Sequence, residues 1–169
     1  MNKSSLKAYA PQARRDFIEM VRGRAALLGL TELNQQLHIA ESVVQGDVAV
    51  ILGQAYPKVV DAQRQTLIQR IRSQGFDATL EAIAYTWFNR FAALRYMEIH
   101  GYLSHGQRVL SSQIEGGLPD ILTHALDIAA SGDLPKLTTE LVGELKLASK
   151  DGELYKRLLV AQCNQLADV

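Results

Sequence analysis

The sequence predicts an all-α fold: a compact multi-helix domain built around one central, aromatic-rich helix that runs from about Ala78 to Ile99. Three observations predict it. Apolar residues recur along most of the chain at the three- and four-residue spacing of an amphipathic helix. Glycine and proline residues separate these stretches, as expected at helix ends. The 169 residues, 47% of them hydrophobic, provide material for one core, so we expect a single domain.

The first part of the chain predicts two helices in succession. Pro11 suits a first helical turn, and the apolar positions that follow it end at Gly29, which marks the first helix. Thr31 suits the N-cap of a second helix that ends at Gly46. The apolar residues of this second helix recur at helical spacing: Leu33, Leu37, Ala40 and Val44.

A third helix is predicted from Pro57 to about Ser73, with Gly75 as its end. Between the second and third helices, the run from Val48 to Leu52 fits either a short strand or a buried turn of helix. Hydrophobic periodicity does not separate these two interpretations of so short a run.

The central helix carries three aromatic residues on one broad apolar face, namely Trp87, Phe88 and Phe91. Arg95 and Glu98 fall within the same face, three positions apart, where two charges are costly to bury unless they pair. We therefore predict an inward-facing ion pair between Arg95 and Glu98. The alternative is a functional polar pocket.

Beyond Gly101, the stretch to Pro119 predicts a loop with at most a short strand at Val109 and Leu110. Three helices complete the chain: Asp120 to Ala130, Pro135 to Ser149, and a last one that begins at Asp151. No glycine, proline or polar cluster ends this last helix where the sequence stops, at Asp168 and Val169. We therefore expect residues 1–169 to be one helical N-terminal domain, truncated from a much longer chain.

Several classes of protein are excluded by composition. The longest aliphatic run, Val48 to Leu52, is far shorter than the roughly 20 residues that a membrane-spanning helix requires. The N-terminal residues lack the apolar region of a secretory signal. A single cysteine, Cys163, rules out an internal disulfide and fits a reducing compartment. We therefore predict a cytoplasmic protein with no membrane partner, and the His and Cys spacing predicts no metal site.

The net charge is zero, but the charges are unevenly distributed along the chain. Residues 1–108 hold 13 Lys or Arg against 9 Asp or Glu, whereas residues 109–169 hold 5 against 9. The basic first part is suited to contact an anionic partner such as DNA phosphate. The candidate contacts are arginines of the first and third predicted helices: Arg14, Arg15, Arg22, Arg64, Arg70 and Arg72. The alternative is a solvated face, because Glu19 is spaced to pair with both Arg15 and Arg22.

The sequence contains no recognisable catalytic or cofactor-binding motif. A methyltransferase that acts on an exocyclic amine needs an Asn/Asp-Pro-Pro-Tyr/Phe element, and all four prolines here are isolated. No glycines have the Gly-x-Gly spacing of a nucleotide-type cofactor loop. Pro119-Asp120 and Glu144-Leu145-Lys146 match the letters of a magnesium-dependent nuclease, but they lie on predicted helices rather than on strands. We therefore expect no catalytic residue in the chain.

One segment resembles a known family. Residues 85–102, which contain Trp87, Arg95 and Glu98, resemble a helical block near the start of PglX-type adenine-specific DNA methyltransferases of BREX phage-defence systems. The same block occurs in related fused restriction-modification enzymes. Residues 6–17, 108–111 and 153–164 agree with further blocks in the same order. The resemblance therefore spans nearly the whole chain.

The resemblance implies a parent enzyme that transfers a methyl group from S-adenosylmethionine to adenine N6 in double-stranded DNA, with its catalytic and cofactor motifs downstream of residue 169. It implies that this chain holds no cofactor. The chain would contact the DNA backbone, dock onto the downstream methyltransferase domain, or both. Two alternatives stay open. One is a scaffold that binds other BREX subunits or a phage antagonist, and the other is the N-terminal part of a fused restriction-modification enzyme.

Overall fold

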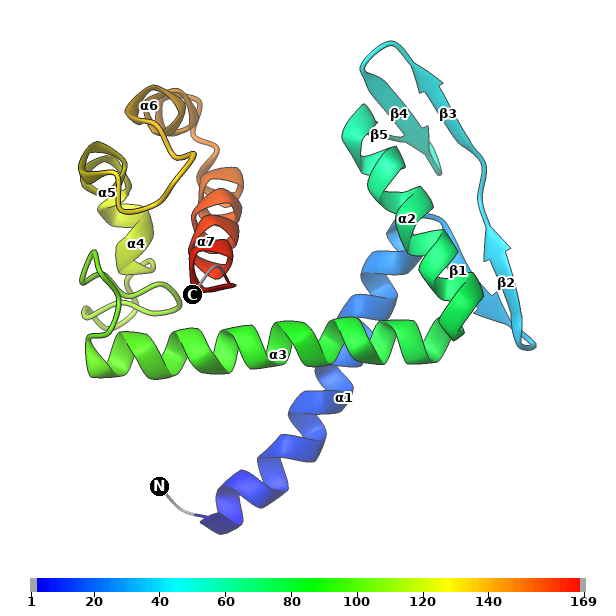
Figure 1. Cartoon of the computed structure of the whole chain (residues 1–169), viewed down its shortest axis with the longest axis horizontal. Coiled ribbons are helices and arrows are strands. Elements are labelled where there is room, and N and C mark those ends of the chain that lie inside the picture. Colours follow the sequence, from blue (N-terminus) through cyan, green and yellow to red (C-terminus); the bar gives the residue numbers. More distant parts are fainter. Residues whose placement is uncertain (1–2, 168–169) are drawn as a thin grey trace. The chain divides into compact units, whose positions relative to one another are not determined.

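The computed structural model describes residues 3–167 and shows a mixed α/β fold (Figure 1). The predicted all-α class is wrong, because two small antiparallel sheets follow the first helix. The order of the described elements is α1 (Lys3–Leu27), β1 (Leu30–Leu33), β2 (Gln36–Ile39), β3 (Ser42–Gln45), β4 (Val48–Ile51), β5 (Gln54–Pro57), α2 (Lys58–Gln74), α3 (Phe76–His100), α4 (Asp120–Thr123), α5 (Ala125–Ser131), α6 (Thr139–Leu147) and α7 (Asp151–Ala167). None of the described helices combines the length and apolarity that crossing a bilayer requires.

The chain divides into two compact units, Met1–Phe88 and Asn89–Val169, and the boundary lies within α3. The first half of α3 belongs to the first unit and its second half belongs to the second unit. Trp87, Phe88 and Phe91, which we expected on the core face of the helix, are each only partly buried.

The segment from Thr31 to Gly46 was predicted to be the second helix, but it is not helical. This segment forms the β1–β2 hairpin and strand β3. Asn34 and Gln35 connect β1 to β2 with φ angles of 51° and 63°, as a two-residue hairpin turn requires and a helix does not allow. Gly46, at φ 58°, lies in the turn between β3 and β4 rather than at a helix end.

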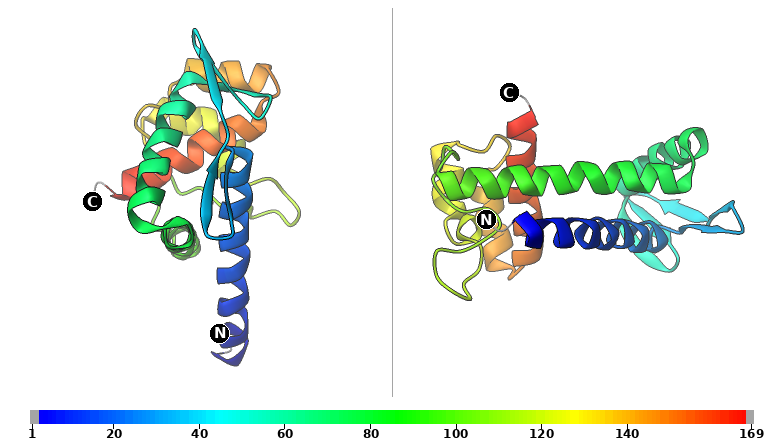
Figure 2. Two further views of the ribbon diagram at one scale, coloured as in Figure 1. Left: turned by 90° about the vertical axis from the view of Figure 1, so that its right-hand side faces the viewer. Right: turned by 90° about the horizontal axis from the view of Figure 1, so that it is seen from below.

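Residues 48–52, for which strand and helical turn were both open, form strand β4 and the turn after it. β4 is the central strand of the three-stranded sheet β3–β4–β5. Ala49 and Ile51 are fully buried and alternate with the exposed Val48 and Val50. This period of two is that of a strand with one covered face, and α2 lies on the covered side (Figure 2).

The core of the first unit joins the end of α1, strand β1, α2 and the start of α3. Its buried members are Ala25, Leu30, Ile68, Ile71, Phe76 and Leu80. Gly29 connects α1 to β1 at φ 70°, and its carbonyl accepts a hydrogen bond of 2.8 Å from the amide of Ala40. A Cβ on residue 29 would lie 2.6 Å from the Cβ of Ala40, so only glycine permits this close approach.

We expect Gly29→Ala to lower the free energy of unfolding by about 2 to 3 kcal/mol, because a left-handed backbone and a steric overlap both oppose the new methyl group. Gly46→Ala is the matched control. It has a similar φ angle of 58° but open space around the position of a Cβ, so only the backbone penalty of about 1 kcal/mol applies. Chemical denaturation measures both variants, and equal losses would show that the contact with Ala40 is unimportant.

The second unit places α4, α5, α6 and α7 around a core that includes Ile121, Val142, Leu154 and Leu158. Residues 101–119 form the predicted loop, and no strand occurs at Val109. The helix predicted from Asp120 to Ala130 is broken at His124 into α4 and α5. The next helix begins only at Thr139, where the side chain of Thr138 accepts a hydrogen bond from the amide of Leu141.

The first and last helices differ in how well their predicted starts agree with the structure. α1 extends to both sides of Pro11, which lies inside the helix rather than in its first turn. The start of α7 at Asp151 is as predicted. The expected stop at Asp168 and Val169 falls outside the described residues.

Candidate functional site

Two of the six arginines predicted to contact DNA pair with carboxylates of α3. Arg14 donates to Glu81 at 3.0 Å, and Arg22 donates to Asp77 at 2.9 Å. Arg22 also lies 3.6 Å from Glu19, the residue whose spacing suggested such a pair. The ion pairs are largely exposed, so each contributes little to stability. They nevertheless reduce the positive charge that α1 presents to an anionic partner.

Arg64 was predicted to contact DNA, and this prediction is wrong because the residue is buried and only 2% exposed. Its Nε donates to the carbonyl of Leu28 at 2.6 Å, and its Nη2 donates to the carbonyl of Ala40 at 2.5 Å. The guanidinium thus joins α2 to the end of α1 and to the segment after β2. Arg64 therefore serves the fold and does not face a surface where phosphate could bind.

Arg15, Arg70 and Arg72 stay exposed in the first unit. Arg15 donates to Gln12 at 2.7 Å, and Arg70 donates to Gln74 at 3.0 Å. No described carboxylate lies within ion-pair distance of these three arginines. They are the exposed members of the predicted set whose positive charge no described carboxylate compensates.

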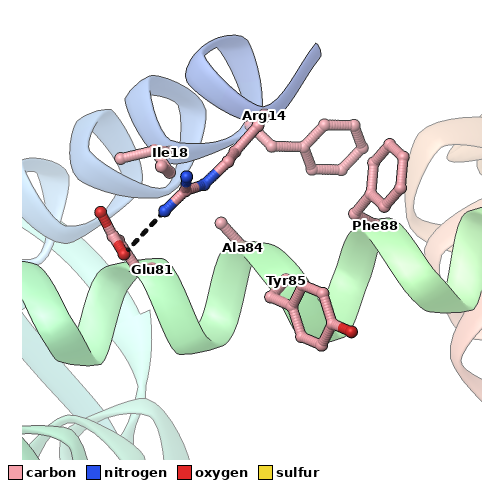
Figure 3. Close-up of a pocket in the computed structure, with 7 residues that line it drawn as sticks. Arg14, Ile18, Glu81, Ala84, Tyr85 and Phe88 are labelled. Atoms are coloured by element: carbon pink, nitrogen blue, oxygen red, sulfur yellow. Dashed lines mark hydrogen bonds and ion pairs between the residues drawn. The ribbon is translucent and has the colours of Figure 1, made fainter. Parts of the chain in front are cut away.

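An open apolar pocket of about 200 Å³ lies between α1 and the first half of α3 (Figure 3). Arg14 and Ile18 extend from α1 toward Glu81 and Ala84 of α3, and the Arg14–Glu81 ion pair closes one side (Figure 3). The rings of Phe17 and Phe88 meet edge to face, with centroids 5.7 Å apart. This pocket was not predictable from the sequence, because its two sides come from helices whose paired residues Arg14 and Glu81 are 67 positions apart.

Glu98 is a buried side chain of the second unit with several hydrogen bonds. Its side chain is 0% exposed, and its two oxygens accept four hydrogen bonds. Oε2 accepts from the amides of Val109 and Leu110, each at 2.8 Å. Oε1 accepts from Arg95 at 2.5 Å and from the hydroxyl of Ser111 at 3.0 Å. The carboxylate of Glu98 therefore holds residues 109–111 of the long loop against α3.

Arg95 pairs with Glu98 but is not inward-facing as predicted, because its side chain is 50% exposed. Its long side chain carries the guanidinium outward, where it also donates to Ser111 at 2.7 Å. Burial of the Glu98 carboxyl has the largest single effect on its pKa, and it raises this pKa because burial favours the neutral acid. The bonds from Leu110, Arg95, Ser111 and Val109 together outweigh it, so the pKa of Glu98 lies below its ordinary value of 4.5.

Asp120 is a second buried carboxylate that holds the same loop. It accepts from the hydroxyl of Ser112 at 2.8 Å and from the amide of Gln113. The hydroxyl of Tyr155 on α7 donates to the carbonyl of Val109 at 3.0 Å and fixes the loop from another side. Pro119-Asp120 is therefore a helix start whose carboxylate binds the loop.

A chain of hydrogen bonds links His105 to α7. The amide of Gln107 donates to Nδ1 of His105 at 3.0 Å, so the ring proton is on Nε2, which donates to Gln162 at 2.7 Å. Gln162 is 1% exposed and donates to Gln165, which in turn donates to the carbonyl of Asp133. The sequence offered no signal for this chain, because its members are spread over residues 105–165.

Cys163 is buried, and burial raises the pKa of its thiol. A raised pKa favours the unreactive thiol form over the thiolate. Within residues that the structure describes, no three His, Cys, Asp or Glu side chains gather as a metal-binding group. The polar clusters of both units thus connect elements of the fold.

No family model matches the sequence. The chain is 42% identical over 169 residues to the adenine-specific methyltransferase BrxX of Escherichia coli O9:H4 (strain HS), a match that covers 98% of the chain. It is 33% identical over 136 residues to the adenine-specific methyltransferase PglX of Lacticaseibacillus casei (strain Zhang), a match that covers 76% of the chain.

The chain spans only a small part of these relatives, 14% of the BrxX protein and 11% of the PglX protein. The resemblance found in the four sequence blocks is confirmed, since the BrxX match extends over 98% of the chain. The chain is therefore a homologue of a short segment of the PglX-type adenine-specific methyltransferases of BREX systems.

Proposed function

We propose that this chain is the N-terminal, non-catalytic portion of an S-adenosylmethionine-dependent adenine-N6 DNA methyltransferase of a BREX phage-defence system. In this proposal the cofactor and the double-stranded DNA substrate are bound by the remainder of the longer protein, and the chain docks onto that remainder. The names of the two relatives and the small share of their length that the chain spans support the proposal.

One observation carries the non-catalytic role. Among the residues that the structure describes, the buried charged side chains are each engaged in tertiary hydrogen bonds that hold the fold: Arg64, Glu98 and Asp120. A catalytic acid, base or nucleophile has to reach a substrate atom, usually from a cleft. The carboxylate oxygens of Glu98 instead face the backbone of the long loop.

The first test compares the 169-residue chain with the complete protein. We expect calorimetric titration of the chain alone to show no binding of S-adenosylmethionine, whereas the complete protein binds the cofactor and methylates adenine in duplex DNA. Micromolar cofactor binding by the chain alone would contradict the non-catalytic role. Magnesium-dependent DNA cleavage by the complete protein would point to the alternative, a fused restriction-modification enzyme.

The second test concerns DNA contact, for which the remaining candidates are Arg15, Arg70 and Arg72. We expect reversal of all three to Glu to leave the DNA affinity of the complete protein unchanged, because the proposal assigns DNA binding to the remainder of the protein. Lys156→Glu, an exposed charge reversal in the second unit, is the control. A loss of affinity that is uniform across DNA sequences, with a weaker salt dependence, would instead establish phosphate contact by these arginines.

A further inference from the structure

The outer face of the β3–β4–β5 sheet is apolar and carries no charge. The antiparallel register places Val50 beside Val43 on one side and Ala55 on the other. Val48 lies between Gln45 and Pro57 in the same way. Because side chains alternate along a strand, these two rows share one face. We call this set the valine face: Val43, Gln45, Val48, Val50, Ala55 and Pro57.

The opposite face of the same sheet is the one that α2 covers. Ser42 donates to Asp61 of α2 at 2.6 Å, and Ile51 and Ala49 are fully buried. Figures 1 and 2 show the sheet lying along α2. On the valine face, Val43 is 46% exposed and Val50 of the central strand is 38% exposed. On the covered face the central-strand residues are buried, although Val44 of the edge strand β3 is 41% exposed.

An antiparallel sheet with one face toward water usually carries polar residues on that face. The neighbouring hairpin conforms, since its outer face pairs Thr31 with His38 and Leu33 with Gln36. The valine face does not, because Gln45 is its one polar member. A contiguous apolar patch of this kind is typical of a surface that a partner covers.

We propose that the valine face is the surface by which this chain docks onto the remainder of the methyltransferase polypeptide, an inference that rests on the proposed function. The absence of charge argues against a phosphate backbone or an anionic lipid surface as the occupant. An apolar protein surface fits it, because burial of valine side chains stabilises the contact without desolvating a charge.

The size of the face favours a covalently linked partner over a second copy of the chain. A stable interface between separate proteins uses about 20 to 30 residues on each side, far more than the six residues of the valine face. A tether removes most of the entropic cost of association, so a smaller apolar patch suffices. The relatives supply such a tethered partner, since the matched segment is only 14% and 11% of their length.

Site-specific photocrosslinking in the complete protein tests the proposal. Val50→p-benzoylphenylalanine is the probe, and the same change at Val160 of α7 is the matched control, because both valines are 38% exposed. We expect Val50 to crosslink within one polypeptide to peptides outside residues 1–169, and Val160 to give no such crosslink. A probe at Val43 repeats the measurement at a second position, and Val50→Lys should then abolish the crosslink from Val43.

Three results would overturn the proposal: crosslinks between two copies, crosslinks to residues 89–169, or no crosslink from either valine. Methylation of adenine by the same preparation separates this inference from the proposed function. If the preparation methylates adenine but gives no crosslink, docking through the valine face is refuted and the proposed function is not. A crosslink without methylation leaves the docking surface in place and refutes the proposed enzymatic parent.

Discussion

Glu98→Ala is expected to lower the free energy of unfolding by about 3 to 5 kcal/mol. The substitution removes an acceptor of four hydrogen bonds, two of them from the backbone amides of Val109 and Leu110. Val109 is fully buried, so its amide has no access to water as a replacement partner. Chemical denaturation of the chain measures the loss.

Arg95→Ala is the informative comparison for Glu98. Because Arg95 is half exposed and three other donors remain on Glu98, its removal should cost only about 1 kcal/mol. Sequence reasoning, which placed both charges in the core, would assign Arg95→Ala a loss of several kcal/mol. Equal losses for Arg95→Ala and Glu98→Ala would show that the ion pair, rather than the loop amides, carries the stabilisation.

The lowered pKa of Glu98 adds a pH dependence to the same experiment. A carboxyl group with a depressed folded-state pKa stabilises the fold fully above its unfolded value, and this contribution is lost as the pH falls through the folded value. The difference in stability between the wild type and Glu98→Gln should therefore be constant at neutral pH. It should shrink below the ordinary glutamate pKa of 4.5. A difference that grows on acidification would contradict the assigned direction of the shift.

Arg64→Met is expected to lower the free energy of unfolding by about 2 to 4 kcal/mol, because two partly buried carbonyl oxygens lose a charged donor. Methionine retains an unbranched apolar side chain, so the loss reports the guanidinium rather than a cavity. Leu28 and Ala40 supply the two carbonyls, one from the end of α1 and one from the segment after β2. Hydrogen exchange should show faster opening of both segments.

Arg70→Met on the same helix is the matched control for Arg64. Arg70 is exposed and bonds only to Gln74, so its substitution should change the stability by no more than about 0.5 kcal/mol. Arg64→Lys should fall between the two, because a single ammonium group cannot reproduce the fork that spans both carbonyls. If Arg64→Met and Arg70→Met behave alike, Arg64 is not the connector that the geometry indicates.

Helix ends set by strong local signals were predictable from the sequence. Pro57 and Gly75 bracket α2 where expected, and α7 begins at Asp151. These features depend on the dihedral preferences of single residues or on one apolar stripe, so they need no knowledge of distant neighbours.

The strands were not predictable in the same way. The apolar residues from Leu33 to Val44 recur every three or four positions by coincidence, and this spacing resembles a helix. The turn at Asn34 and Gln35 lacks the glycine that usually marks a two-residue hairpin. The conformation depends on the pairing of β3, β4 and β5 and on the packing of α2 against them. Hydrophobic periodicity describes one segment at a time and does not contain these contacts between segments.

The residues alone were enough to predict the family resemblance, the lack of a catalytic motif, the longer helices and the candidate arginines. They did not show which charges serve the fold, which became evident in the three-dimensional arrangement. Arg64 is enclosed by two backbone carbonyls, Glu98 by loop amides, and Arg95 extends to solvent from the same helix as Glu98. The physical reason is that the burial of a charge depends on donors and acceptors brought from elsewhere in the chain, and helical periodicity carries no information about them.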